Sequence, residues 1–133
     1  MSNTTNLTKQ IEQLLLESGL TREPMTEKLK KHIVVQVIAY MHNAVVSRTI
    51  IKKPTGNITV SSFDTGEKLA EKICPFDNFI HIIDGAGVIT INNKEYNLTM
   101  GDGIIIPAHA SHSFNANEQF KMISTIIKSG YED

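Results

Sequence analysis

From His32 onward the chain is a succession of short β-prone runs separated by turn residues. The clearest turn signals are Pro54–Asn57, Asp84–Gly87 and Asn92–Asn93, because Gly, Asn, Asp and Pro each favour backbone conformations that reverse the chain. Between the turns we predict strands over residues 33–40, 45–52, 58–63, 79–83, 88–91, 94–98, 104–106, 111–115 and 120–128. Short strands at this regular spacing are typical of an all-β sandwich or barrel.

The first 31 residues have a different pattern. Leu7, Ile11, Leu14 and Leu15 are spaced at i, i+4, i+7 and i+8, which predicts a helix with one apolar face. Residues 20–31 are charged and contain a proline, so we expect a linker or a second short helix. The predicted organisation is an N-terminal helix and linker over residues 1–31 and a β-barrel domain over residues 32–133.

Composition excludes several classes of protein. A chain of 133 residues with 41% hydrophobic and 20% charged residues can bury the core of one folded domain. The net charge of -1 provides no basic surplus for nucleic acid. One cysteine, Cys74, permits no internal disulfide. The polar N-terminal residues predict no signal peptide, and the short apolar runs predict no segment that crosses a bilayer. We therefore expect a cytoplasmic protein that binds neither nucleic acid nor membrane.

The stretch from Gly101 to His112 carries the most specific pattern in the chain. Gly101, Pro107 and His112 match three positions of the motif G-x5-P-x-G-x2-H-x3-N. His109 replaces the second glycine of that motif, and Ala116 replaces the final asparagine.

An earlier stretch matches a companion motif, G-x5-H-x-H-x3-E-x6-G, only at its ends. Gly66 and Gly85 are present, while Lys72, Cys74 and Asn78 occupy the positions of the two histidines and the glutamate. On these two motifs the chain resembles the cupin superfamily, and most closely its small single-domain bacterial members. The resemblance implies a jelly-roll-like, double-stranded β-helix barrel behind the N-terminal helix, and a homodimer.

In cupins with a working metal site, the three residues of the earlier motif and the later histidine bind iron, manganese, nickel or zinc. The resemblance implies that the same four positions would hold a metal here. This chain keeps His112, and Cys74 could add a thiolate. The ammonium of Lys72 would repel a dication, and Asn78 is a weak substitute for a carboxylate. Because a His–Cys pair falls short of the three protein ligands usual in catalytic zinc sites, we expect no cofactor. A divalent transition metal (Zn, Fe, Mn or Ni) on His112 and Cys74 is the alternative.

Alternation along the strands, counted from Asn78 and His112, predicts the apolar lining of the barrel interior: Ile80, Ile82, Ile106 and Phe114. Such walls suit a small ligand held by a few polar groups, and equally a barrel filled by its own side chains. Lys72 is either solvated at the mouth or turned inward as an anchor for an anion. Cys74 is either a small buried hydrophobic residue or part of the site.

We therefore predict a cupin that binds a small anionic or sugar-derived molecule through Lys72, Cys74, Asn78, His112 and these apolar walls. If it is an enzyme, an isomerase or lyase is favoured, with His112 as general acid or base and Lys72 holding the negative charge of the substrate. The alternatives are a metal-dependent oxygenase or isomerase using His112 and Cys74, and a non-catalytic dimeric scaffold.

Overall fold

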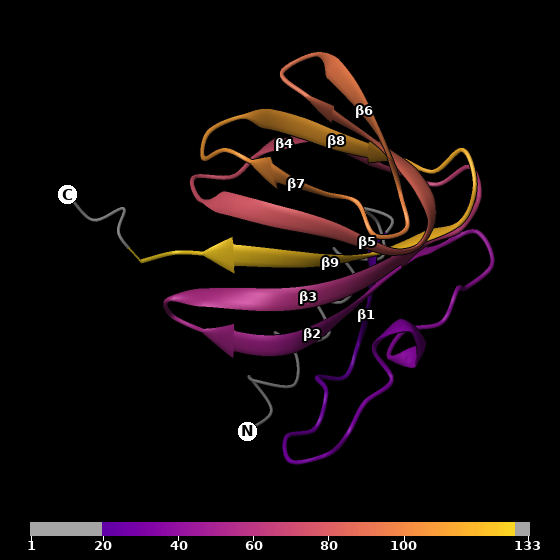
Figure 1. Ribbon diagram of the computed structural model, residues 1–133, viewed down its shortest axis with the longest axis vertical. Helices are drawn as coiled ribbons and strands as arrows, with labels where there is room; N and C mark the ends of the chain where they lie inside the picture. Colours follow the sequence, from indigo (N-terminus) through magenta and orange to yellow (C-terminus); the bar gives the residue numbers. More distant parts are fainter. Residues whose placement is uncertain (1–19, 130–133) are drawn as a thin grey trace, which may run out of the picture.

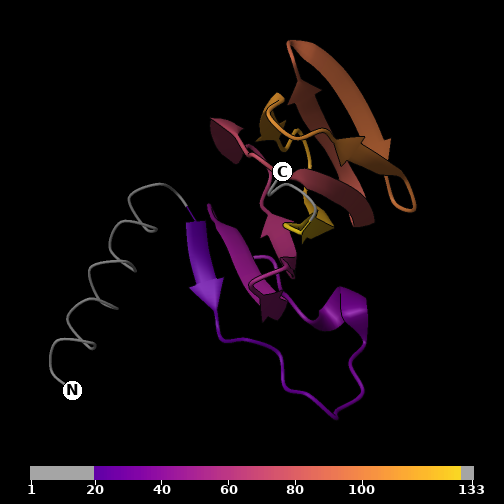
Figure 2. The same cartoon turned by 90° about the vertical axis from the view of Figure 1, so that its left-hand side faces the viewer.

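The computed structural model describes residues 20–129, and these residues form nine strands and one short 3-10 turn, η1 (Val34–Gln36). The strands curl into a barrel with two facing sheets (Figures 1 and 2), which confirms the all-β barrel. The predicted N-terminal helix lies in residues 1–19, outside the described part of the chain. The strands are β1 (Leu20–Glu23), β2 (Val45–Lys53), β3 (Gly56–Phe63), β4 (Lys68–Ile73), β5 (Asp77–Ile91), β6 (Lys94–Thr99), β7 (Gly103–Ile106), β8 (Ser111–Asn115) and β9 (Phe120–Ile127).

Strand β5 belongs to both sheets. Its first half pairs with β9 and β7 in sheet A, and this sheet continues from β9 through β3 and β2 to β1. Its second half pairs with β6 and β8 in sheet B, and this sheet ends at β4. The strand bends at a bulge between Ile82 and Asp84 and at Gly85, whose φ is +70°. A Cβ on Gly85 would collide with the carbonyl oxygen of Gln119. The prediction of two strands divided by a turn at Asp84–Gly87 was wrong, because this glycine bends one continuous strand instead.

The apolar run over residues 33–40 does not form the predicted strand. It forms η1 and lies across the outer face of sheet A, where side chains of the sheet bind its carbonyl groups. Lys121 Nζ donates to Val35 O at 2.6 Å, and Ser62 Oγ donates to Ala39 O at 2.9 Å. The buried side chains of this contact form a small outer cluster: Val37, Ile38, Val46 and Val60. The run therefore covers the sheet and adds no strand to it.

Two further strands were not predicted. Leu20–Glu23, expected in a linker or short helix, is strand β1 and pairs in parallel with β2 from Val45 onward. The charged segment Lys68–Ile73 is strand β4 at the edge of sheet B. Alternating charge is compatible with an edge strand because much of it faces water.

The inner faces of the two sheets pack around three phenylalanines. The ring of Phe63 stacks on that of Phe120, with centroids 4.3 Å apart, and is tilted against Phe114 at 5.9 Å. All three side chains are buried in one core cluster that draws on both sheets. The core therefore joins β3, β8 and β9, which lie far apart in the sequence.

We predict that Phe63→Ala lowers the free energy of unfolding by about 3–5 kcal/mol, the usual cost of removing a buried phenylalanine ring. Urea unfolding followed by circular dichroism measures this loss. Met25→Ala, at an exposed position, is the control and should change stability by less than about 0.5 kcal/mol. A loss below about 1 kcal/mol for Phe63→Ala would contradict this account of the core.

Candidate functional site

His112 is the buried polar residue around which the candidate site is built. It lies on β8, its side chain is 2% exposed, and its ring meets the edge of Phe114 at a centroid distance of 5.8 Å. Nδ1 lies 3.2 Å from the carbonyl oxygen of Ala110. Because a carbonyl oxygen only accepts, Nδ1 carries the proton and donates it, which leaves Nε2 with its lone pair as the acceptor or basic nitrogen.

The surroundings of His112 favour its neutral form. Burial lowers the pKa of the imidazole below its ordinary value, and the ammonium of Lys72 lowers it further. The hydrogen bond to Ala110 acts in the opposite direction and is outweighed. At neutral pH the ring is therefore uncharged and ready to accept a proton or a hydrogen bond.

Lys72 lies directly opposite His112 in the antiparallel pairing of β4 with β8. Directly opposed residues in such a pair project on the same face of the sheet. The side chain of Lys72 is nevertheless exposed, so its ammonium is solvated while its charge still acts on the buried imidazole. The structure therefore has Lys72 exposed at the position of β4 that pairs with His112, and its role as an anchor for an anion stays a prediction.

Cys74 lies beyond the end of β4, half-buried and with a free thiol. Its carbonyl oxygen accepts the backbone N–H of His109 at 2.7 Å, and Asp77 Oδ1 accepts the N–H of Ala108 at 2.8 Å. These two bonds join the loop after β4 to the turn before β8. His109 itself is exposed, with a φ of +69° in that turn.

Asn78 is buried in the inner wall of sheet A. Its Oδ1 accepts a hydrogen bond from Ser124 Oγ at 2.7 Å, so this oxygen is engaged within the wall. Sequence reasoning missed Ser124, although the alternation of Phe120, Met122 and Ser124 on β9 would have placed it on the inner face.

A polar part of the inner wall was also missed. Ser47 on β2 pairs with Ser61 on β3, and Ser61 pairs with Met122, a residue of the barrel core. Residues in one row project on the same face, so both serines face inward, and both are buried. The inner face of β2, β3 and β9 therefore carries hydroxyl groups. The opposing inner positions of β5, β7 and β8 are apolar and buried in the core cluster: Ile80, Ile82, Ile106 and Phe114.

The donor set does not fit a catalytic metal. Among residues 20–129 no group of three or more His, Cys, Asp or Glu side chains is placed to hold a metal ion. His112 Nε2 and the Cys74 thiol are the available soft donors of the predicted set, and the Lys72 ammonium lies on the same face as the imidazole. Catalytic zinc sites generally use three protein ligands, and a nearby cation weakens any such site.

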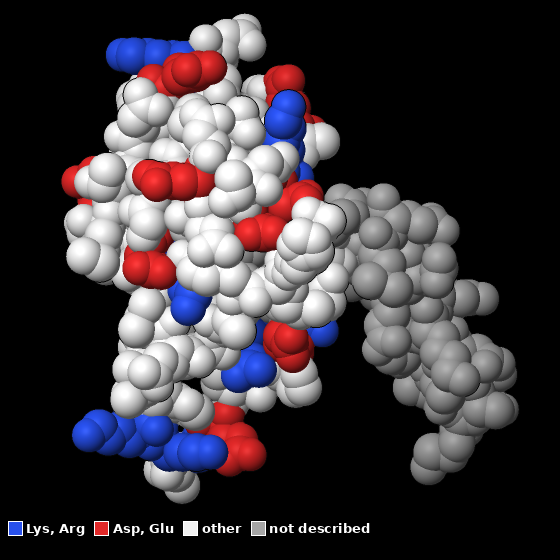
Figure 3. Space-filling view, turned by 90° about the vertical axis from the view of Figure 1, so that its right-hand side faces the viewer, with Lys and Arg blue, Asp and Glu red and all other residues white. Residues whose placement is uncertain are grey.

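The surface carries charge of both signs. Acidic and basic side chains are interspersed over the face shown in Figure 3 and do not gather into one basic area. Within residues 20–129, no helix is long and apolar enough to cross a membrane.

Comparison with known proteins agrees with this geometry. Residues 61–126 match the family model described as "Cupin domain", a span that contains both candidate motifs. No curated protein matches the chain. Among solved structures, a conserved protein of unknown function from Streptococcus pyogenes (SPY1581) is 29% identical, with a TM-score of 0.73 over 77% of this chain and 90% of that one.

Two further structures are similar. A cupin superfamily protein from Desulfitobacterium hafniense is 25% identical, with a TM-score of 0.71 over 76% of this chain and 93% of that one. A cupin 2 conserved barrel domain protein from Leptotrichia buccalis is 28% identical, with a TM-score of 0.69 over 71% of this chain and 46% of that one. The chain belongs to the cupin superfamily, and its described residues form one small cupin barrel.

We predict that His112 makes the protein less stable as the pH falls below about 6.5, the pKa of an unperturbed histidine. The folded pKa is lowered, so the unfolded chain takes up the proton first and folding loses free energy until the folded pKa is passed. Thermal unfolding from pH 7.5 to pH 5 measures this loss. His112→Gln should show a smaller fall over the same range, and parallel profiles for the two proteins would contradict the prediction.

A second prediction concerns the influence of Lys72 on that pKa. Lys72→Met removes the ammonium that opposes protonation, so the pKa of His112 should rise, as measured by NMR titration of the imidazole. Lys68→Met is the matched control, because Lys68 lies on the same strand and pairs with Asn115, three residues along β8 from His112. An unchanged pKa in Lys72→Met would show that the two charges are not coupled.

Proposed function

We propose that this cupin binds a small hydroxy acid or acidic sugar derivative beside His112. The observation that carries the proposal is the pairing of a buried, neutral imidazole with a solvated ammonium, Lys72, on the same face of β4 and β8. A ligand with one negative charge and one hydroxyl group would satisfy both residues. Its anionic group would bind the ammonium, and its hydroxyl would donate to Nε2.

The polar inner wall supports the same ligand class. Buried serines on β2 and β3 and the Asn78–Ser124 pair can exchange hydrogen bonds with further hydroxyl groups. The apolar side chains opposite them would contact the carbon skeleton. This division of apolar walls and a few convergent polar groups is usual in small-molecule sites.

If the bound molecule is also a substrate, His112 is suited to act as a general base. A lowered pKa keeps Nε2 unprotonated at neutral pH, and the Ala110 carbonyl holds the ring in the tautomer that exposes this nitrogen. Removal of a proton next to a carboxylate would begin an isomerisation or an elimination, and the Lys72 ammonium would stabilise the developing negative charge. We place the protein in the cytoplasm, since its single cysteine is a free thiol.

The test is a thermal-shift assay at pH 7.5 with succinate, malate, gluconate, glucuronate and inorganic phosphate. A ligand that binds the folded state raises the unfolding temperature, and we expect the largest rise with a hydroxy acid or sugar acid. His112→Gln and Lys72→Met should each weaken that binding at least about tenfold by titration calorimetry, the loss expected for one good polar contact. Lys68→Met should bind like the wild type.

Two results would overturn the proposal. If no acid of the panel shifts the unfolding temperature, the filled-barrel scaffold is the better account. If the shift occurs only with added Zn²⁺ or Mn²⁺ and disappears with EDTA, the ligand binds through a metal and the direct contact with Lys72 is wrong.

A further inference from the structure

Strand β4 contains a bulge directly beside His112. In its pairing with β8, Leu69 is opposite Phe114. Lys72 is opposite His112, and the register shifts between these two pairs. Two residues of β4, the second of them Glu71, therefore oppose one residue of β8. Bulges of this kind often lie next to functional sites, where they redirect a side chain.

The bulge decides which charge lies opposite the imidazole. Leu69 packs against the barrel core, so strict alternation from it would turn Glu71 inward and Lys72 outward. The extra residue advances the pattern by one position, and Lys72 takes the place opposite His112. A regular strand after Leu69 would instead place the carboxylate of Glu71 there, and a carboxylate repels an anionic ligand.

Glu71 is held on the other face of sheet B by Ser111. Ser111 precedes His112 on β8 and therefore projects on the opposite side of the strand. Its Oγ donates to Oε1 of Glu71. The backbone of Ser111 is bonded to the turn between β5 and β6: its N–H donates to Asn92 Oδ1 at 3.2 Å, and its carbonyl oxygen accepts the N–H of Asn92 at 2.8 Å. The carboxylate is therefore bonded to a residue whose position is already fixed.

We propose that Glu71 is a positioning residue that makes the site selective for anions. Its bond to Ser111 keeps the carboxylate on the outer face of sheet B and so holds the bulge in the register that presents Lys72 to His112. The residues of β4 are exposed apart from Leu69, and burial specifies the register of such a strand only weakly. A hydrogen bond to a charged acceptor is stronger than a neutral one and can supply that specification. The anion selectivity rests on the proposed function, whereas the register does not.

Backbone NOEs measured by NMR test the register without any ligand. In the wild type we expect NOEs between Lys72 and His112, because the two residues are directly paired. Glu71→Ala should lose most of their intensity, whereas Glu71→Gln, which keeps a side-chain oxygen as acceptor, should retain them. NOEs between Lys68 and Asn115, on the other side of the bulge, should persist in all three proteins and show that β4 is folded. Unchanged Lys72–His112 NOEs in Glu71→Ala would overturn the proposal.

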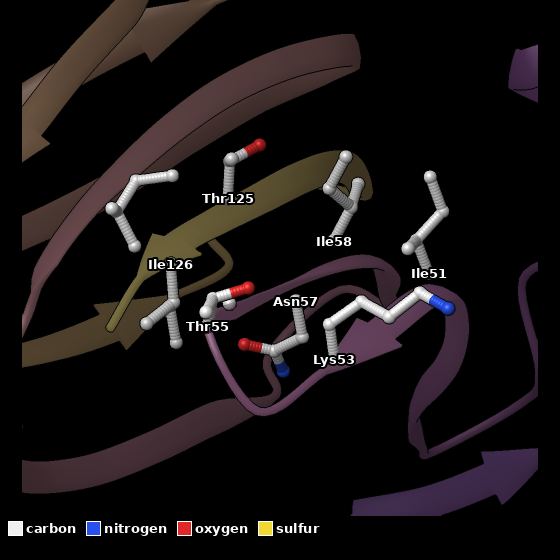
Figure 4. A pocket seen from close by; sticks show the side chains of 9 residues that line it. Ile51, Lys53, Thr55, Asn57, Ile58, Thr125 and Ile126 are labelled. Carbon is white, nitrogen blue, oxygen red and sulfur yellow. The ribbon is translucent and has the colours of Figure 1, made fainter. Parts of the chain in front are cut away.

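A hollow on the outer face of sheet A is a second place where an acid could bind. Its volume is about 210 Å³, and it is formed by β2, β3, β9 and the turn after β2 (Figure 4). Ile51 and Ile58 contribute apolar walls, and Lys53 contributes a cation. An acid held there would depend on Lys53 and would be indifferent to Glu71, so Lys53→Met is the control.

Titration calorimetry with gluconate tests the selectivity. We expect Glu71→Ala to weaken gluconate binding at least about fivefold, the scale of one lost hydrogen bond. Removal of a negative charge alone would strengthen the binding of an anion, so this loss has the opposite sign to a purely electrostatic effect. Glu71→Gln should bind at least as well as the wild type, and Lys53→Met should bind like it.

The outcomes separate this proposal from the proposed function. Equal gluconate affinities for the wild type and Glu71→Ala would overturn the role of Glu71 in selectivity. If Lys53→Met alone weakens binding, the acid occupies the hollow of sheet A and the proposed function is wrong. If the wild type does not bind gluconate, the proposed function fails for this acid. In both of these cases the NOEs still decide whether Glu71 holds the register.

Discussion

The bend in β5 is the constraint on which the rest of the barrel depends. One strand of 15 residues contributes to both sheets, and it can do so only because the bulge after Ile82 and the left-handed conformation of Gly85 turn it between them. The close approach of Gln119 leaves no room for a side chain at Gly85. The position of every inner residue on sheet B relative to sheet A follows from this turn. Ile91, the last residue of the strand, then lies beside His112.

The electrostatics of the site follow from its position in that frame. His112 is held between β4 and β5 on the inner face of sheet B, where apolar neighbours disfavour its protonated form. Lys72 is opposite it but reaches water, so its charge is kept at little cost in solvation. A buried base beside a solvated cation is a combination that a hydroxy acid can satisfy. It is unsuited to a dication, which would need the ammonium to be neutral.

Much of this arrangement could be predicted from the sequence. The motifs at Gly66–Gly85 and Gly101–His112, taken together, predicted the fold, and strand alternation placed Ile80, Ile82, Ile106 and Phe114 on the buried face. The strand predicted from the apolar pattern of residues 33–40 does not form. The run 33–40 has the composition of a strand, yet its carbonyl groups are bound by Lys121 and Ser62, partners that lie far away in the sequence.

The buried serines of the inner wall were missed for a similar reason, because their surroundings depend on contacts between segments far apart in the sequence. Ser47 and Ser61 carry no motif, and their place beside Met122 depends on the register between β2, β3 and β9. Register is set by long-range pairing, which one sequence does not reveal. The β5 bend was likewise predicted as a loop, because Asp84–Gly87 has the composition of a turn whether the chain reverses there or merely bends.

The alternation of β5 also keeps the inner and outer faces of sheet A chemically separate. Asn78 and Ile80 face the barrel interior, while Phe79 and His81 lie on the outer face of sheet A. A change at Phe79 therefore removes atoms from the outer surface and leaves the inner wall in place, and the reverse holds for His112. The two faces still share one backbone, and close-packed sheets transmit small displacements from one face to the other. Since the first half of β5 carries Phe79 outside and Asn78 inside, a displacement of the strand at Phe79 would also move the inner wall that contains Asn78.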